Sequence, residues 1–245
     1  MFLKSVQQIK QAQAQAPAQA QAPRAYQKIS AIYMWNMKVG EKKPVPRDCI
    51  EHNKPYLSNF KIIGPAEIMP LVPQYSPQMA FIWPLIPHWI ITADLGRLLY
   101  IYFHGNFYFD VDSKITKPFF PASGGANKMY LFVEELLPSV AALGPREIKT
   151  PAHLLRVCNF AFGASVKKHP FLKDVIDECL KRLTYLLGDL KFKPADFKKT
   201  DILWVCGPDV MTTVYHQKKH LYGNQIVLLA QPYIHHLRLW SWRDD

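Results

Sequence analysis

Short apolar runs rich in strand-forming residues alternate along this chain with segments whose apolar residues recur at helical spacing. Residues 29–35, 59–63 and 107–109 are runs of the first kind, and the segment from Ile91 to Tyr102 repeats its apolar residues at helical intervals. The period of the apolar residues is the primary sequence signal of secondary structure. Strands that alternate with helices favour a layered α/β domain. We therefore expect an α/β fold with a mixed central sheet flanked by helices.

The same patterns predict the remaining elements. We expect a short helix over residues 46–55, mostly irregular chain over the proline-rich residues 64–87, a helix around 129–137, a strand near 159–162, a helix from 169 to about 187, a strand around 202–206, a helix after Pro208 and a last strand near 225–229. In open α/β sheets, ligands bind beyond the carboxyl ends of the strands. Residues that directly follow a strand are therefore the first candidates for a site.

Composition favours one folded domain with a tail. The chain has 245 residues, of which 49% are hydrophobic, so it can bury a core without disulfide or metal support. Residues 1–24 are dominated by Gln, Ala and Pro, a composition that cannot bury a core. We expect a low-complexity tail over residues 1–24 and a single domain over residues 25–245. The 4 cysteines form no CxxC pair, which disfavours a zinc ribbon or a dithiol redox site.

The formal net charge of +11 has several interpretations. Basic chains bind nucleic acids, anionic membranes or phosphorylated molecules. The excess is densest between Lys167 and Lys199 and carries no KH, RRM or zinc-finger spacing, so we interpret it as a solvated face and expect no nucleic-acid partner. The sequence has no apolar run of membrane-spanning length and no apolar core of a secretory signal at its start. We expect a soluble cytoplasmic protein, bacterial or viral, with peripheral membrane contact still open.

Two pairs of charged residues carry the chemistry. Asp110 and Asp112 follow the strand at 107–109, and alternate strand residues share a face, so both carboxylates can reach one cation. Hard divalent ions prefer such oxygen ligands, although a polar turn is the alternative for this pair alone. Asp94 and Arg97 lie three apart on one face of the preceding helix. Taken alone, that spacing more often means a surface ion pair.

The ordered string that contains these residues resembles the signature of a known enzyme family. Ala93-Asp94-Leu95-Gly96-Arg97, followed by Gly105-Asn106-Phe107-Tyr108-Phe109-Asp110-Val111-Asp112, is similar to the A-D-x-x-R … G-G-x-Y-x-D-x-D block of the DXD sugar transferases of glycosyltransferase family 32. Those include the initiating α-mannosyltransferases of the fungal Golgi, and the glucosyltransferase domains of large clostridial toxins share a similar block. Weaker similarities at residues 32–35, 159–163, 169–172, 206–212 and 235–242 extend the resemblance over residues 28–242. Asn106 and Cys206 depart from the pattern, and the spacing from His236 to Ser241 is slightly long.

The resemblance implies a GT-A nucleotide-sugar-binding fold and a metal-dependent, retaining transfer of a sugar. The donor would be a UDP- or GDP-linked sugar, the acceptor a hydroxyl of a glycan or glycoprotein, and the cofactor Mn²⁺ or Mg²⁺. The site residues that it implies are Asp94 and Arg97 as catalytic residues at the donor sugar, Asp110, Asp112 and His236 (or His235) at the metal, Asp110 also at the donor ribose, Trp35 stacked on the base, and Ser241 and Trp242 at the β-phosphate. A core role for Trp35 and an exposed histidine pair are the alternatives.

Further assignments stay open. Glu134 or Glu135 would stabilise an oxocarbenium-like transition state, or is simply a solvated helix residue. A phosphohydrolase also places Asp-x-Asp after an apolar strand, with the first Asp as nucleophile, but its motif normally continues with Thr or Val where this chain has Lys114. A sugar- or nucleotide-binding module without catalytic activity is the second alternative to an active glycosyltransferase.

Overall fold

The computed structural model of the protein describes residues 27–38, 40–119, 127–139, 142, 153–188, 199–230 and 233–238. The tail predicted for residues 1–24 lies outside these ranges. The strands are β1 (Ile29–Met34), β2 (Leu57–Ile63), β3 (Asn106–Phe109), β4 (Ser113–Ile115), β5 (Met129–Leu136), β6 (Leu155–Ala164), β7 (Ile226–Leu229) and β8 (Ile234–His236). The helices are α2 (Asp48–Asn53), α3 (Pro65–Ile68), α4 (Leu71–Tyr75), α5 (Pro77–Ile82), α6 (Trp89–His104), α7 (Pro170–Gly188), α8 (Lys199–Val205) and α9 (Pro208–Tyr222), with short 3₁₀ helices η1 (Lys54–Tyr56), η2 (Trp83–Leu85) and η6 (Gly223–Gln225).

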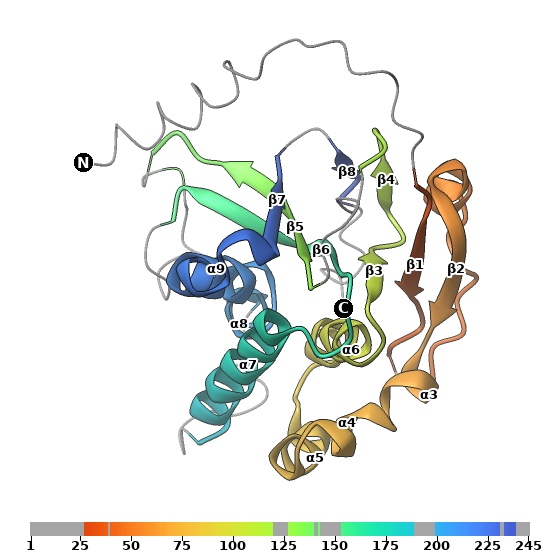
Figure 1. Ribbon diagram of the computed structural model, residues 1–245. Helices are drawn as coiled ribbons and strands as arrows, with labels where there is room; N and C mark the ends of the chain where they lie inside the picture. Colours follow the sequence, from red (N-terminus) through yellow and green to blue (C-terminus); the bar gives the residue numbers. More distant parts are fainter. Residues whose placement is uncertain are drawn as a thin grey trace.

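A 6-stranded mixed sheet forms the centre of the fold, in the order β2-β1-β3-β6-β5-β7 (Figure 1). Strand β1 pairs in parallel with β2 and β3, and β5 pairs in parallel with β7. Strand β6 runs antiparallel to both of its neighbours, β3 and β5. Strands β4 and β8 form a separate antiparallel ribbon. The expectation of an α/β fold with a mixed central sheet is confirmed.

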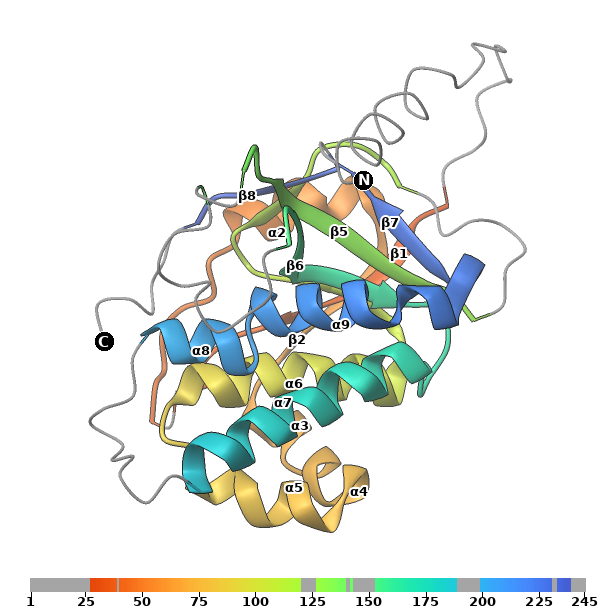
Figure 2. The ribbon, with the colours of Figure 1, turned by 90° about the vertical axis from the view of Figure 1, so that its left-hand side faces the viewer.

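The two faces of the sheet carry different layers. Successive strand residues point to opposite faces, so Ile32 and Tyr108 join one core cluster while Tyr33 and Phe109 join the other. The first cluster is shared with α6, α7, α8 and α9, which lie together against one face of the sheet (Figure 2). The second cluster includes Ile residues of α2, β4 and β8. The residues that follow the strands, between these two layers, can therefore form a binding site.

Helix α6 is oriented by its two caps. The ring of His88 accepts a hydrogen bond from the backbone of Ile90 at 3.2 Å and begins the helix. Gly105 ends it with a positive φ of 71°, a conformation that glycine adopts without a steric penalty, and the chain reverses into β3. The N-terminal half of α6 consequently lies beside the carboxyl end of β3.

Three segments differ from the sequence-based expectation. Residues 129–136 form a strand, not a helix, because they sit between β6 and β7 and their apolar run is buried on both faces. Residues 199–205 form helix α8, not a strand, and pack their apolar side on the helical core. Much of 64–87 is helical, with Pro65 and Pro77 in the first turns of α3 and α5, where the missing N–H costs nothing.

The cysteines belong to the core. Cys49, Cys158, Cys179 and Cys206 are all buried and free. None of the helices in the described parts of the chain is both long and apolar enough to cross a bilayer.

Candidate functional site

A cavity of about 340 Å³ opens at the carboxyl ends of β1 and β3. Its walls come from the ends of both strands, the first half of α6, strands β5 and β6, the α8–α9 junction and the residues at the end of β8. Of the residues singled out from the sequence, it is lined by Trp35, Asp94, Arg97, Asp110, Asp112, Glu134 and His236. Ser241 and Trp242 lie outside the described residues. The charged pair on the helix and the aspartate pair after the strand thus meet at one cavity.

Arg97 lies between two aspartates. Its Nη2 pairs with Oδ1 of Asp94, and its Nη1 is 2.9 Å from Oδ1 of Asp110. Nη1 also donates to the backbone carbonyl of Asn159 at 3.1 Å. The side chain of Arg97 is only 10% exposed and that of Asp94 4%. Buried charges need partners, so this pair is part of an internal charge network and the surface ion-pair alternative is wrong.

Asp110 is held by a second set of contacts. The hydroxyl of Tyr108 donates a hydrogen bond to its Oδ1. Burial raises the pKa of the Asp110 carboxyl, whereas the charges of Arg97 and His236 oppose this increase. The side-chain amide of Asn159 donates to Oδ1 of Asp94 at 3.4 Å. Tyr108 and Asn159 were not assigned a role from sequence, although both belong to the strings that carry the resemblance.

Asp112 reaches the site by way of a turn. Strand β3 ends at Phe109, and the backbone N–H of Ser113 donates to the carbonyl of Asp110 at 3.0 Å, which closes a turn over residues 110–113. The two aspartates therefore do not continue the strand alternation that was expected. The carbonyl of Asp112 accepts a hydrogen bond from the backbone of Leu237 at 3.0 Å, which joins this turn to the end of β8.

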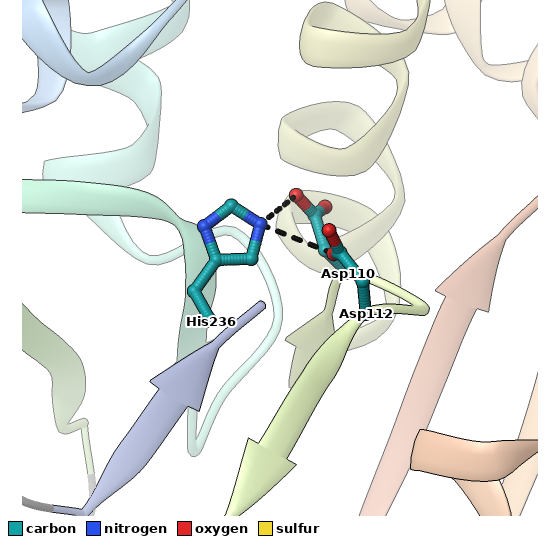
Figure 3. A group of neighbouring side chains, drawn as sticks. All are labelled: Asp110, Asp112 and His236. Carbon is teal, nitrogen blue, oxygen red and sulfur yellow. Dashed lines mark hydrogen bonds and ion pairs between the residues drawn. The ribbon is translucent and has the colours of Figure 1, made fainter. Parts of the chain in front are cut away.

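His236 completes a cluster with the two aspartates (Figure 3). Its Nε2 is 3.1 Å from Oδ1 of Asp112 and 3.8 Å from Oδ2 of Asp110. The ring of Phe160 stacks on the imidazole, with 4.2 Å between the ring centroids. His235 is the neighbouring residue on β8 and is exposed. Strand alternation thus turns His236, and not His235, toward the aspartates.

The cluster has the composition of a divalent-cation site. One ligand atom from each of Asp110, Asp112 and His236 lies within 4.8 Å of the others. Burial lowers the pKa of His236, but the bond to Asp112 and the charge of Asp110 outweigh it, so the pKa lies above its ordinary value. The site therefore favours positive charge. Carboxylates suit Mg²⁺ and Mn²⁺, and an imidazole in the set is more compatible with Mn²⁺ than with the strictly oxygen-seeking Mg²⁺.

Further residues of the cavity come from loops and from β5. Trp35 is partly exposed and its indole Nε1 donates to the carbonyl of Lys43 at 2.9 Å, so it is not a core tryptophan. Glu134 lines the cavity from β5. Lys43, Glu41 and Arg238 also line it and were missed from sequence. These three residues belong to no recognisable sequence motif, because the fold of the chain brings loop residues to a site without a fixed spacing in the sequence.

Comparisons with known proteins bear on the fold. No protein-family model matches the chain, and no curated protein matches it. Among solved structures, the PaToxG glycosyltransferase is similar, with a TM-score of 0.51 and 15% sequence identity over 80% of this chain and 72% of that one. At this level of identity the similarity concerns the fold. The chain has a glycosyltransferase fold of the GT-A kind, as the sequence resemblance implied.

Proposed function

We propose that the protein is a metal-dependent, retaining glycosyltransferase that moves a sugar from a nucleotide diphosphate sugar to an acceptor hydroxyl. One observation carries the proposal: Asp94 and Arg97 of α6 converge with the Asp110, Asp112 and His236 cluster on one cavity. The fold shared with a glycosyltransferase supports it. So does the resemblance of residues 93–112 to the family 32 block.

The cluster at the end of β3 would hold the diphosphate of the donor. Asp112 and His236 would bind Mn²⁺, and Asp110 would contact the ion through water or the donor ribose. When bound, the cation neutralises the charge that develops on the departing nucleotide diphosphate. Ser241 and Trp242 would donate hydrogen bonds to the β-phosphate, and Arg238, which also lines the cavity, adds positive charge.

Asp94 and Arg97, the charged pair of helix α6, would act at the donor sugar. Arg97 and Asn159 both contact Oδ1 of Asp94, so the carboxylate is held at the cavity wall, where it would accept hydrogen bonds from sugar hydroxyls. Arg97 pairs Asp94 with Asp110 and would thereby fix the sugar site relative to the metal site. Glu134, which lines the same cavity, is the carboxylate that would stabilise an oxocarbenium-like transition state.

The alternative functions gain less support. A nucleophilic Asp110 would need a carboxylate oxygen free to attack, yet its Oδ1 is engaged by Arg97 and Tyr108 and its Oδ2 faces His236. A sugar- or nucleotide-binding module without activity would use the same cavity, and turnover of the donor distinguishes it from the enzyme.

Incubation of the full chain with a panel of UDP- and GDP-sugars and Mn²⁺ separates the three functions. Metal-dependent release of the nucleotide diphosphate supports transfer. Release of inorganic phosphate from a sugar phosphate would instead support the hydrolase, and binding without turnover would support the binding module. The acceptor, which we propose to be a glycan or glycoprotein, is then sought with the preferred donor. The cytoplasmic location and the single domain over residues 25–245 stay predictions.

A further inference from the structure

The loop after β1 forms the wall of the cavity beside Trp35. The side-chain amide of Asn36 donates to the carbonyl of Lys43 and accepts from its N–H, both at 3.1 Å. The indole of Trp35 donates to the same carbonyl at 2.9 Å. A turn closes between Lys38 and Glu41, whose N–H donates to the Lys38 carbonyl at 3.1 Å, and Gly40 takes a positive φ of 80° within it. The loop is therefore tied together by hydrogen bonds next to the indole.

This loop presents an ion pair to the cavity. The Nζ of Lys43 lies 2.7 Å from Oε1 of Glu41, and both residues line the cavity. The side chain of Glu41 is only 15% exposed, whereas that of Lys43 is 60% exposed. An ordinary surface ion pair contributes little to stability and does not require a largely buried carboxylate. The pair thus has a position and a burial that suit recognition of a ligand.

The chemistry of the pair selects among the bases. An ammonium only donates hydrogen bonds and a carboxylate only accepts them, so the pair offers a donor followed by two acceptors. The pairing edge of guanine has the complementary order, because O6 accepts while N1–H and the N2 amino group donate. Uracil would place its O2 carbonyl against the carboxylate, and adenine or cytosine would place an amino group against the ammonium. Such mismatches leave polar groups unpaired and lower affinity.

We infer that Glu41 and Lys43 read the base of the donor and that the donor is a guanosine diphosphate sugar. This inference rests on the proposed function, since it assumes that a nucleotide occupies the cavity with its base at Trp35. The carboxylate of Glu41 accepts from N1–H and the N2 amino group, and the ammonium of Lys43 donates to O6. The phosphates of the donor then extend toward Asp112, in the turn after β3, and toward His236, at the end of β8.

Calorimetric titration of the full chain with nucleoside diphosphates in the presence of Mn²⁺ tests the assignment. GDP should bind about ten- to a hundredfold more tightly than UDP, ADP or CDP, the discrimination expected of a good bidentate contact. Inosine diphosphate lacks only the N2 amino group and should bind more weakly than GDP. In Glu41→Gln, which exchanges an acceptor for a donor, GDP and inosine diphosphate should bind alike and the preference over UDP should disappear.

Matched variants separate this effect from a general loss of charge. Glu51 and Lys54 form a comparable surface pair at 2.6 Å, 47% and 50% exposed, and Glu51→Gln should keep the full preference for GDP. Lys43→Met should weaken GDP binding, whereas Lys54→Met should not. Tighter binding of UDP than GDP, or an unchanged ratio of GDP to inosine diphosphate affinity in Glu41→Gln, would overturn the inference and leave the proposed function standing. Failure to bind any nucleoside diphosphate with Mn²⁺ would overturn the proposed function itself.

Discussion

Among single residues, Arg97 connects the charged pair of α6 with the aspartates after β3. It pairs with Asp94 and Asp110 and donates to the backbone of Asn159 from a position with almost no solvent exposure. The neighbouring Tyr108 and Asp110 raise the pKa of Arg97 even though burial opposes its charge. Its guanidinium can bridge two carboxylates at once, which a lysine ammonium cannot do with the same geometry. Arg97 is therefore a structural centre of the site as well as a candidate catalytic residue.

Substitution Arg97→Ala should consequently destabilise the protein. It leaves two carboxylates without their counter-charge, and breaking such a buried pair typically costs about 3–5 kcal/mol; because Asp110 is partly exposed, we expect the lower end of that range. Urea unfolding measures the loss. Lys173→Ala, at a surface pair whose side chains are 56% and 45% exposed, should change stability by less than about 1 kcal/mol. Equal effects of the two variants would contradict the internal network.

Asp112 tests the metal assignment. The variant Asp112→Asn keeps the size of the side chain but loses the charge, so Mn²⁺ affinity and metal-dependent donor turnover should fall by more than about a hundredfold, since even outer-shell changes cost about 10- to 100-fold. Mn²⁺ titration and nucleotide release measure the two effects, and circular dichroism should show an unchanged fold. Asp48→Asn, at an exposed position of α2, is the control. Turnover near that of the natural chain would remove Asp112 from the metal site.

At the scale of secondary-structure elements, the junction of α8 and α9 shapes one wall of the cavity. Leu203 and Pro208 line the cavity on either side of Gly207. A Cβ at Gly207 would lie 2.7 Å from Cα and 2.8 Å from the carbonyl oxygen of Leu203, both backbone atoms that cannot move aside cheaply. The close approach of the two helices therefore requires glycine at this position.

The variant Gly207→Ala should force α8 and α9 apart. We expect a loss of stability of about 1–3 kcal/mol, as for other overpacked sites, together with weaker donor binding because the cavity wall moves. Thermal unfolding and nucleotide titration measure these effects. Gly188→Ala, at the end of α7 where an added Cβ meets nothing within 4 Å, should be neutral or slightly stabilising. A neutral Gly207→Ala would show that the junction can relax.

The packing of α9 on β6 should make stability depend on pH. The rings of His153 and His216 stack with 4.0 Å between centroids. Burial, together with the charges of nearby His216, Arg156 and Lys219, lowers the pKa of His153 from 6.5 to about 4. The unfolded chain therefore takes up the proton first, so this contribution to stability is complete above about 6.5 and is lost as the pH falls toward 4.

Urea unfolding across the interval from pH 6.5 to 4 measures this dependence. Carboxylates titrate in part of the same interval, so the informative quantity is the difference between variants. His153→Gln should lose less stability than the natural chain as the pH falls through this range. His220→Gln, at an exposed position of α9, should behave like the natural chain. A steeper loss in His153→Gln would contradict the assignment.

At the scale of the whole molecule, the cluster of Asp110, Asp112 and His236 joins distant parts of the chain. Asp112 and His236 are 124 residues apart in sequence and meet because β4 and β8 pair. Unfolding would separate the ligands, so Mn²⁺ should bind only the folded state. At a free concentration of 100 times the dissociation constant, Mn²⁺ should add about 2.7 kcal/mol to the free energy of unfolding. A Mn²⁺-dependent rise of the melting temperature that disappears in His236→Gln would agree, whereas an equal rise in both would place the ion elsewhere.

Strong local patterns were sufficient for part of this molecule. The α/β class, the first strand, helix α6 and strand β3 follow from apolar periodicity. The segment from Ala93 to Asp112 places the charged pair of α6 beside the aspartate pair after β3, because Gly105 reverses the chain between them. The two pairs lie within about 20 residues, so local geometry largely dictates their encounter. His236 was predicted as a metal ligand only through the resemblance, because no spacing in the sequence shows that β8 pairs with β4.

The remaining elements depend on contacts between segments that are distant in the sequence. The run from Met129 to Leu136 suits a buried helix or a buried strand equally well, and only its neighbours β6 and β7 make it a strand. Residues 202–205 become helical because their apolar side faces the helical core. Glu41 and Lys43 reach the cavity through a turn and the hydrogen bonds of Asn36. The apolar periods and the charged motifs can be read along the sequence, whereas the ambiguous runs and the loops depend on contacts between distant segments, because the free energy of those contacts exists only once the chain is packed.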